Sequence, residues 1–390
     1  MSFRFLGQAP PSKSLLNRAL IVKSWFPRLI IEGDNLCDDI QVMKKAIASL
    51  DTSQDFYCGL SATAFRFLAL RLSRKKGRFL LKGEDALWRR PFKDLSVILS
   101  QLGVEIFKTS EGWCLVSQGW QPQGDYLVVP SQVSSQYASA LVLNSWNYER
   151  DIYFSLTSQK ISYLYFKMTI DFVKQLGMEI KQSGKEFYIP KNQTLKKFYY
   201  KVEQDQSCLF ALAALAVLNG KVVFTNWESK SLQPDSIFLD LLKNMGVGIE
   251  LKNETISIFQ TKNLKNINVD LSGSPDLFPV LSVLCAKAEG ASQLSGLSHQ
   301  AFKESHRLEK VIELLNLSGI QTELKKDTLW IYGKENWSSI PSFSFKSDHD
   351  HRMVMAAQLV KSLSVPIDIQ GKEAINKSFP DFFSLVGSSL

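Results

Sequence analysis

Cationic side chains recur where the sequence predicts helices to begin. They are Lys13 and Arg18 in PSKSLLNRAL, Arg90 before Pro91, Lys303 and Arg307 in FKESHRLEK, His351 and Arg352 in DHRMVM, and Lys377 before SFPDFF. Because a helix N-terminus carries partial positive charge, a cation there is unfavourable by roughly 0.3–1 kcal/mol. A bound anion offsets this cost by accepting from backbone N–H groups and pairing with the cations. The sequence therefore predicts several helix starts that bind anionic ligands.

Two acids lie among these cations. Asp276 follows Pro275 at a predicted helix start, and Glu304 stands between Lys303 and Arg307. A carboxyl group so placed can accept or deliver a proton. The residues alone leave open that Asp276 is an ordinary first-turn acid, which a helix start favours.

Small residues make up the turn CGLSATAFR at 58–66. Gly59, Ser61, Ala62 and Thr63 would let the backbone approach a ligand closely. Serine and threonine also cap helices without any ligand, so this turn by itself is a weak signal.

The elements that must position these residues come from a repeat. A helical segment ending in glycine and running into a strand recurs with glycine at positions 103, 177, 246 and 319, at spacings of 74, 69 and 73 residues. Weaker copies lie at Gly387 and near residue 50. Each glycine is predicted to cap the C-terminus of its helix in the left-handed conformation.

Six units of about 70 residues fit the chain, each with two helices and a few strands. The first helix of each unit is apolar on nearly all sides and is predicted to be buried. These helices are expected to begin near Ser14, Ser61, Ser135, Ser207, Asp276 and His351. The predicted fold class is α/β, with two domains of three repeated units each.

Composition excludes several classes of protein. The chain has 390 residues, of which 45% are hydrophobic and 22% charged, as in soluble globular proteins. No apolar run approaches the roughly 20 residues of a membrane span, and the N-terminus lacks the apolar core of a signal peptide. We therefore expect a cytoplasmic protein with no membrane partner.

The cysteines and histidines suggest no metal site. Five cysteines are widely spaced with no CxxC pair, which favours buried, reduced thiols over disulfides or zinc. His349 and His351 have no apparent third ligand nearby. We predict neither a metal nor a cofactor.

The net charge of +8 is spread along the chain. The densest basic run, RKKGR at 74–78, is predicted to be a solvated loop, so nucleic acid is not expected as a partner. A diffuse positive field would instead attract small polyanionic substrates.

Taken in order, the motifs resemble those of EPSP synthases, which are enolpyruvyl transferases. The resemblance runs through nearly the whole chain and rests on PSKSLLNRAL, DDIQVM, GLSATAFRFL, RRPFKDL, VSSQYASALV, SYLYFKMTIDFVKQLG, SLQPD, SPDLFPVLSVL, FKESHRLEK, DHRMVM and KSFPDF. It implies a monomer with an inside-out α/β barrel fold in two domains of three α/β units. Residues 12–202 would bind shikimate 3-phosphate, and residues 203–390 with 1–11 would carry much of the phosphoenolpyruvate site.

The same resemblance implies a reaction and its residues. The enolpyruvyl group of phosphoenolpyruvate would pass to the 5-hydroxyl of shikimate 3-phosphate by addition and elimination, with Asp276 as base, Glu304 as acid and Lys13 assisting. The residues implied for shikimate 3-phosphate are Lys13, Ser14, Arg18, Ser134, Ser135, Gln136, Ser162, Tyr165, Asp276 and Lys303. Those implied for phosphoenolpyruvate are Lys13, Ala62, Arg90, Gln136, Arg307, His351, Arg352 and Lys377.

Some positions depart from the family pattern. The GNAGT turn of the family is Gly59-Leu60-Ser61-Ala62-Thr63 here, and the Ala62 methyl should narrow the phosphoenolpyruvate pocket. We hypothesise that the protein tolerates glyphosate. Further departures are Pro11, Ala86, Gln204, His299, Ala301 and His306.

Two alternatives remain at this stage. A UDP-N-acetylglucosamine enolpyruvyl transferase would use a loop cysteine, but no cysteine lies between Cys58 and Cys114. A non-catalytic descendant that binds a phosphorylated ligand would not need both Asp276 and Glu304.

Overall fold

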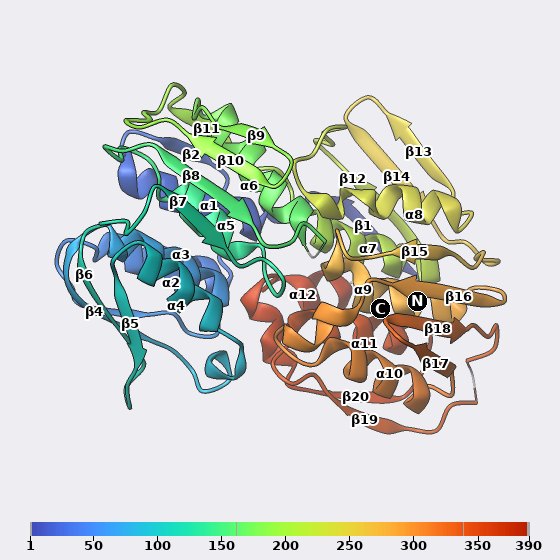
Figure 1. Ribbon diagram of the computed structural model, residues 1–390. Coiled ribbons are helices and arrows are strands. Elements are labelled where there is room, and N and C mark those ends of the chain that lie inside the picture. The colour runs from blue at the N-terminus through green and yellow to red at the C-terminus, as the bar shows by residue number, and fades with distance from the viewer. Residues whose placement is uncertain (1, 161, 338, 388–390) are drawn as a thin grey trace. The chain divides into compact units, whose positions relative to one another are not determined.

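The computed structural model describes residues 2–160, 162–337 and 339–387. The chain divides into two compact units. We call Pro11–Glu203 the inserted unit, and the segments before and after it the terminal unit. The first strand, β1 (Phe3–Gly7), pairs in parallel with β12 (Gly220–Phe224), so both ends of the chain belong to the terminal unit. In Figure 1 the dark-blue β1 accordingly lies beside the yellow-green β12.

Four sheets share one topology, in which a parallel pair is extended by an antiparallel hairpin. In the inserted unit these are β3-β4-β6-β5 (Asp55–Tyr57, Lys76–Lys82, Trp113–Gln118, Glu105–Lys108) and β7-β8-β10-β9 (Tyr126–Val129, Ile152–Leu156, Glu186–Ile189, Lys181–Ser183). In the terminal unit they are β1-β12-β14-β13 (β14 Thr255–Phe259, β13 Ile249–Lys252) and β15-β16-β18-β17 (Asn268–Asp270, Ala291–Ser295, Thr328–Tyr332, Gln321–Lys325).

Each unit also holds a shorter, two-stranded parallel sheet. These sheets are β2 (Ile30–Glu32) with β11 (Tyr199–Lys201), and β19 (Phe343–Lys346) with β20 (Ile367–Gln370). Three sheets per unit confirm the predicted fold of two domains with three α/β repeats each.

Two α-helices belong to each repeat. The first helices are α1 (Lys13–Trp25), α3 (Ala62–Ser73), α5 (Gln136–Leu143), α7 (Gln206–Asn219), α9 (Phe278–Lys287) and α11 (His351–Ser362). The second helices are α2 (Asp38–Ala48), α4 (Lys93–Gln101), α6 (Tyr163–Gln175), α8 (Phe238–Asn244), α10 (Arg307–Leu317) and α12 (Phe382–Gly387). Short 3₁₀ turns are η1 (Leu87–Arg89), η2 (Pro234–Ile237), η3 (Pro275–Leu277), η4 (Ser298–Phe302) and η5 (Lys372–Lys377).

The first helices form the cores, as predicted. Helix α7 is buried from Gln206 to Leu218, and α7, α9 and α11 pack on one another in the terminal unit. Strands such as β14 and β18 alternate between buried and partly exposed residues, so each covers the helices with one face and meets solvent with the other. Helices inside and sheets outside make the inside-out barrel.

The repeated glycines cap their helices. Gly103, Gly177, Gly246 and Gly319 have φ of +73°, +104°, +83° and +65°, which confirms the predicted left-handed caps. At Gly177 a Cβ would also lie 2.4 Å from the Cβ of Lys196, so only glycine fits.

The basic run at 74–78 differs from its prediction. Arg74 lies over the rings of Trp25, Trp120 and Tyr148 at 4.8, 5.0 and 4.8 Å, and donates to the carbonyl of Asn144 at 2.6 Å. Residues 76–78 belong to β4. The prediction of a solvated loop is therefore wrong, because aromatic residues distant in sequence surround the first of these cations.

All five cysteines are buried thiols. Across residues 2–160, 162–337 and 339–387, no helix combines the length and apolar character needed to cross a bilayer.

Candidate functional site

Charged side chains from five segments of the terminal unit meet in one cluster. Its members are Asp276, Lys303, Glu304, Arg307, Asp350, Arg352 and Lys377, which we call the charged cluster. Six of these seven residues were predicted to bind substrate or act in catalysis. Residues up to 101 positions apart in the sequence thus converge in space.

Arg307 is the centre of the charged cluster. Its side chain is 1% exposed and donates to Asp350 Oδ2 at 2.7 Å, Asp276 Oδ1 at 2.8 Å and Glu304 Oε2 at 2.7 Å. Burial acts to lower the pKa of this guanidinium, but Asp350, Glu304 and Asp276 together raise the pKa well above its ordinary value. Arg307 is thus a permanent cation, positioned by three carboxylates.

Asp276 has a cation on each carboxylate oxygen. Arg307 donates to Oδ1 and Arg352 NH2 donates to Oδ2, both at 2.8 Å, and Lys303 Nζ lies 3.6 Å from Oδ1. Burial acts to raise the pKa of Asp276, but Arg352, Lys303 and Arg307 outweigh it and hold the pKa well below its ordinary value. The carboxylate is therefore ionised at neutral pH. An anionic ligand that drew on these cations would increase its basicity.

The acid Glu304 lies between two cations. It accepts from Arg307 and from Lys377 Nζ, the latter at 3.3 Å, and its side chain is 15% exposed. Lys377 is the last residue of η5, so the C-terminal repeat reaches the same carboxylate as α10.

Helix α11 begins in a constrained turn. Asp348 and His349 are consecutive non-glycine residues with φ of +51° and +60°. Asp350 then caps the helix by accepting from the backbone N–H of Arg352 at 2.9 Å. Residues held in this conformation cost free energy and gather at functional sites. Here the turn positions the side chains of Asp350 and Arg352 in the charged cluster.

His351, predicted to bind phosphoenolpyruvate, is buried at the start of α11. Its side chain is 2% exposed, and Nδ1 lies 4.0 Å from Asp350 Oδ1. It thus lies beside the carboxylate that anchors Arg307.

The inserted unit holds the remaining predicted residues. Lys13 Nζ pairs with Asp39 Oδ2 at 2.9 Å, and their side chains are 14% and 6% exposed. Arg18 is buried and donates to Thr169 Oγ1 at 2.7 Å and to the carbonyls of Ser14 at 2.7 Å and Tyr165 at 3.2 Å. Burial lowers the pKa of Arg18 to about 10, which leaves it charged at neutral pH. Arg18 thus connects the start of α1 with the start of α6.

Gln136 links the turn at 59–63 to α5. Its Oε1 accepts from Arg66 NH1 at 2.6 Å, and its Nε2 donates to Thr63 Oγ1 at 3.0 Å. Its backbone N–H donates to Ser134 Oγ at 3.3 Å. Arg66 is held between the rings of Phe92 and Tyr137, at 5.2 and 4.9 Å.

The other predicted residues of the inserted unit stand at helix starts. Ser135 is the N-cap of α5, and Ser162 is the N-cap of α6 with φ of +51°. Ala62 is the first residue of α3 and is buried, while Arg90 follows η1 and is half-buried. The carbonyl of Pro91, next to Arg90, accepts from Tyr137 Oη at 2.9 Å, which ties this segment to α5.

Several polar residues around the predicted site received no role from the sequence. They are Asp350, Ser207, Asp235, Asp39, Thr169 and Arg66. Asp350 had a usable signal, since an acid directly before the cations of a predicted helix start is a favoured N-cap. The others act through contacts with residues 26 or more positions away in the sequence, which no local pattern shows.

His299 is buried beneath the charged cluster in η4. It is 2% exposed, and within the described part of the chain neither ring nitrogen has a hydrogen-bond partner. Burial and the nearby Lys303 charge lower the pKa of His299 to about 3. At a pH above the ordinary histidine pKa of 6.5, the imidazole of His299 is neutral in both the folded and the unfolded state.

Acid should therefore destabilise the fold through His299. As pH falls from 6.5 towards 3, the unfolded state binds a proton that the folded state does not, at about 1.4 kcal/mol per pH unit. We expect His299→Gln to abolish about 2–3 kcal/mol of the stability loss between pH 7 and pH 4.5, measured by urea unfolding. His306→Gln, at a side chain 39% exposed, is the control. Equal pH slopes in wild type and His299→Gln would refute this role.

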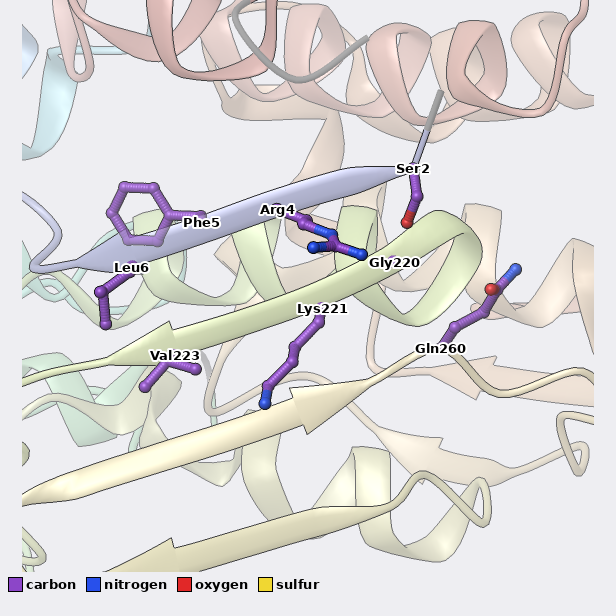
Figure 2. Close-up of a pocket in the computed structure, with 8 residues that line it drawn as sticks. All are labelled: Ser2, Arg4, Phe5, Leu6, Gly220, Lys221, Val223 and Gln260. Carbon is purple, nitrogen blue, oxygen red and sulfur yellow. The ribbon is translucent and has the colours of Figure 1, made fainter.

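A pocket elsewhere in the terminal unit is less suited to the predicted chemistry. Figure 2 shows it along β1 and β12, lined by Ser2, Arg4, Phe5, Leu6, Gly220, Lys221, Val223 and Gln260. Arg4 and Lys221 supply cations, but no carboxylate lines it. None of the predicted site residues is among the residues that line it, so the charged cluster fits the predicted chemistry better than this pocket does.

No group of three or more histidine, cysteine or acidic side chains suited to a metal occurs in residues 2–160, 162–337 and 339–387. The absence of a metal stays a prediction.

Comparison with known proteins identifies the family of this chain. The family model described as EPSP synthase (3-phosphoshikimate 1-carboxyvinyltransferase) matches residues 26–385. The 3-phosphoshikimate 1-carboxyvinyltransferase of Methanocaldococcus jannaschii is 29% identical, over 98% of this chain and 94% of that protein. The enzyme of the same name from Clostridium kluyveri is 30% identical, over 96% of this chain and 92% of that protein.

Solved structures share the fold. An EPSP synthase from Acinetobacter baumannii has a TM-score of 0.78 at 22% identity, covering 100% of this chain and 96% of that one. The enolpyruvyl transferase NikO from Streptomyces tendae has a TM-score of 0.74 at 15% identity, covering 100% and 95%. At these identities the likeness shows the fold alone.

Proposed function

Because this chain belongs to the EPSP synthase family, we propose that it transfers the enolpyruvyl group of phosphoenolpyruvate to the 5-hydroxyl of shikimate 3-phosphate. The observation that carries the proposal is the environment of Asp276. This ionised carboxylate accepts from an arginine on each oxygen, and one of these arginines, Arg307, also donates to Glu304. This arrangement combines a base, an acid and the positive charge that two anionic substrates require.

The cations offset the charge of the substrates. Phosphoenolpyruvate carries a phosphate and a carboxylate, and shikimate 3-phosphate carries another of each. Arg307, Arg352 and Lys377 are available in the terminal unit, and Lys13 and Arg90 in the inserted unit. Fixed cations of this kind stabilise a charged transition state without reorganising during the reaction.

The protons move between named groups. Asp276 accepts the proton of the 5-hydroxyl as its oxygen bonds to C2 of phosphoenolpyruvate, and an acid protonates the methylene carbon C3. Glu304 is the proposed acid, with Lys13 assisting. The Glu304 carboxylate then takes back a proton from C3 while the C2–O bond to phosphate breaks. This restores the double bond, and the proton held by Asp276 leaves with inorganic phosphate.

The inserted unit is proposed to bind shikimate 3-phosphate. The supporting observations are the hydroxyl and amide groups at its helix starts, from Ser14, Ser134, Ser135, Gln136 and Ser162. Arg18 fixes Ser14 and Tyr165 relative to one another through their carbonyls. We further propose that the protein works as a cytoplasmic monomer.

The experiment is an assay of phosphate release from purified protein, given each substrate alone and both together. Release that requires both substrates supports the proposal. Binding of both ligands without release would favour a non-catalytic descendant. Release with UDP-N-acetylglucosamine in place of shikimate 3-phosphate would reassign the acceptor.

Ala62 leads to a prediction about inhibition. It is 1% exposed and precedes Thr63, which hydrogen-bonds to Gln136. An inhibitor longer than phosphoenolpyruvate, such as glyphosate, should meet the Ala62 methyl first. Because one excess methyl group in a packed site costs about 1–3 kcal/mol, Ala62→Gly should lower the glyphosate inhibition constant about 5- to 150-fold.

The matched control is Ala69→Gly, a buried alanine in the middle of the same helix. This variant has the same loss of helix stability from a glycine but leaves the turn at 59–63 unchanged. Its glyphosate inhibition constant should therefore equal that of the wild type. An unchanged constant in Ala62→Gly would disprove the hypothesis of tolerance through this methyl.

A further inference from the structure

Arg352 is anchored through a buried hydroxyl. Its NH2 nitrogen donates to Ser207 Oγ at 3.2 Å and to Asp276 Oδ2 at 2.8 Å. Ser207 Oγ in turn donates to Asp235 Oδ2 at 3.0 Å. Ser207 is 6% exposed and Asp235 3% exposed, so bulk water competes little for these bonds.

The direction of each hydrogen bond in this chain is determined. A serine hydroxyl has one proton and two lone pairs, and a carboxylate accepts only. Because Asp235 takes the serine proton, a lone pair of Ser207 is left for Arg352. The two N–H bonds of one guanidinium nitrogen lie in a plane, so engaging one with Ser207 aims the other at Asp276.

The two arginines on Asp276 are therefore supported differently. Arg307 has a charged anchor, Asp350, at 2.7 Å, whereas the anchor of Arg352 includes a neutral hydroxyl. A hydrogen bond to a neutral oxygen is weaker than one to a carboxylate. The hydrogen bond between Arg352 and Ser207 is thus weaker than the one between Arg307 and Asp350.

On the basis of the proposed function, we propose that Ser207 and Asp235 are positioning residues that orient Arg352 for phosphoenolpyruvate. Ser207 holds the guanidinium plane, and Asp235 fixes the direction of the serine hydroxyl. Neither residue touches the substrate in this scheme. Their effect is on the affinity for phosphoenolpyruvate, and the site for shikimate 3-phosphate is unaffected.

The test compares Ser207→Ala, Ser207→Thr and Asp235→Asn by steady-state kinetics and by calorimetric titration with phosphoenolpyruvate. Losing a hydrogen bond to a charged group should raise the KM and Kd for phosphoenolpyruvate about tenfold in Ser207→Ala. The KM for shikimate 3-phosphate should stay within about twofold of the wild-type value, because the substitution does not disturb the structure as a whole. Ser207→Thr, which keeps the hydroxyl, should restore most of the affinity.

Two further variants separate positioning from stability. Ser318→Ala removes another buried hydroxyl, which donates to Leu314 O at 2.8 Å at the end of α10, and should leave both KM values unchanged. The double variant Ser207→Ala/Asp235→Asn should bind phosphoenolpyruvate no more weakly than Ser207→Ala, because Asp235 acts through the hydroxyl.

The outcomes are distinguishable. A wild-type KM and Kd for phosphoenolpyruvate in Ser207→Ala, or an equal rise in both KM values, would overturn the positioning role. A wild-type protein that binds phosphoenolpyruvate but releases no phosphate would refute the proposed function. Weaker phosphoenolpyruvate binding by Ser207→Ala in that protein would still support the positioning role.

Discussion

Asp276→Asn is expected to lower the rate of phosphate release about 10²–10⁴-fold, the range for removing a general base. The amide has the size of the carboxylate but cannot accept the hydroxyl proton. It also removes the negative charge that Arg307, Arg352 and Lys303 share. The three cations then lack one counter-ion, so phosphoenolpyruvate should bind at least as tightly as to the wild type.

The combination of lost turnover with retained binding is what marks Asp276 as the base. Single-turnover kinetics would measure the chemical step, and calorimetry would measure phosphoenolpyruvate binding. Asp240→Asn is the control, since this acid is 76% exposed on α8 and pairs with the exposed Lys243. A turnover in Asp276→Asn within a few-fold of wild type would direct the search for the base to Glu304.

The pH profile should agree with this assignment. Because its cations hold the pKa of Asp276 well below the ordinary value of 3.8, the free enzyme keeps the base ionised throughout the neutral range. The ionised form is lost only in acid well below the ordinary pKa of an aspartate. Any acidic limb of kcat/KM near neutral pH must arise from another group.

Arg307→Met is expected to reduce the free energy of unfolding by roughly 3–5 kcal/mol, as when one partner of a buried ion pair is removed. The reason is Asp350, whose side chain is 0% exposed and which accepts from Arg307 at 2.7 and 3.4 Å. Methionine fills similar space but leaves this carboxylate buried with its main counter-ion gone. Activity should be abolished in the same variant, because Asp276 and Glu304 lose their shared cation.

A second substitution separates stability from activity. In Arg307→Met/Asp350→Asn the buried charge is gone, and asparagine caps a helix about as well as aspartate. We expect this double variant to recover a large part of the lost stability in urea unfolding and none of the phosphate release. If activity recovered together with stability, the role of Arg307 would be structural only, with no part in catalysis. No recovery of stability would mean that the uncompensated Asp350 charge is not the cause.

Much of the architecture follows from local features of the sequence. The recurring glycine predicted the ends of four helices because the left-handed cap is a local requirement that other residues meet at a cost. Apolar character on all sides predicted the burial of helices such as α7 because a helix with no polar face has to be enclosed. The cations at helix starts, which local electrostatics disfavours, identified most of the charged cluster.

The partners of those residues depended on the tertiary structure. Nothing near Arg352 in the sequence points to Ser207, 145 positions away, and nothing near Arg74 points to the rings that hold it. A local sequence pattern shows that a charge is unfavourable at a given position. It does not show which distant side chain compensates that unfavourable free energy.

The sequence by itself thus determined the repeats, the buried helices and the identity of most of the residues that meet in the charged cluster. Only the tertiary structure decided that Arg307 is held by Asp350, that both oxygens of Asp276 are occupied by arginines, and that His299 is buried with no hydrogen-bond partner among the described residues. The physical reason is the distance along the chain over which each interaction acts. Backbone capping and hydrophobic periodicity act within a few residues, whereas the pKa and orientation of a buried charge depend on every group within several ångströms, whatever its place in the chain.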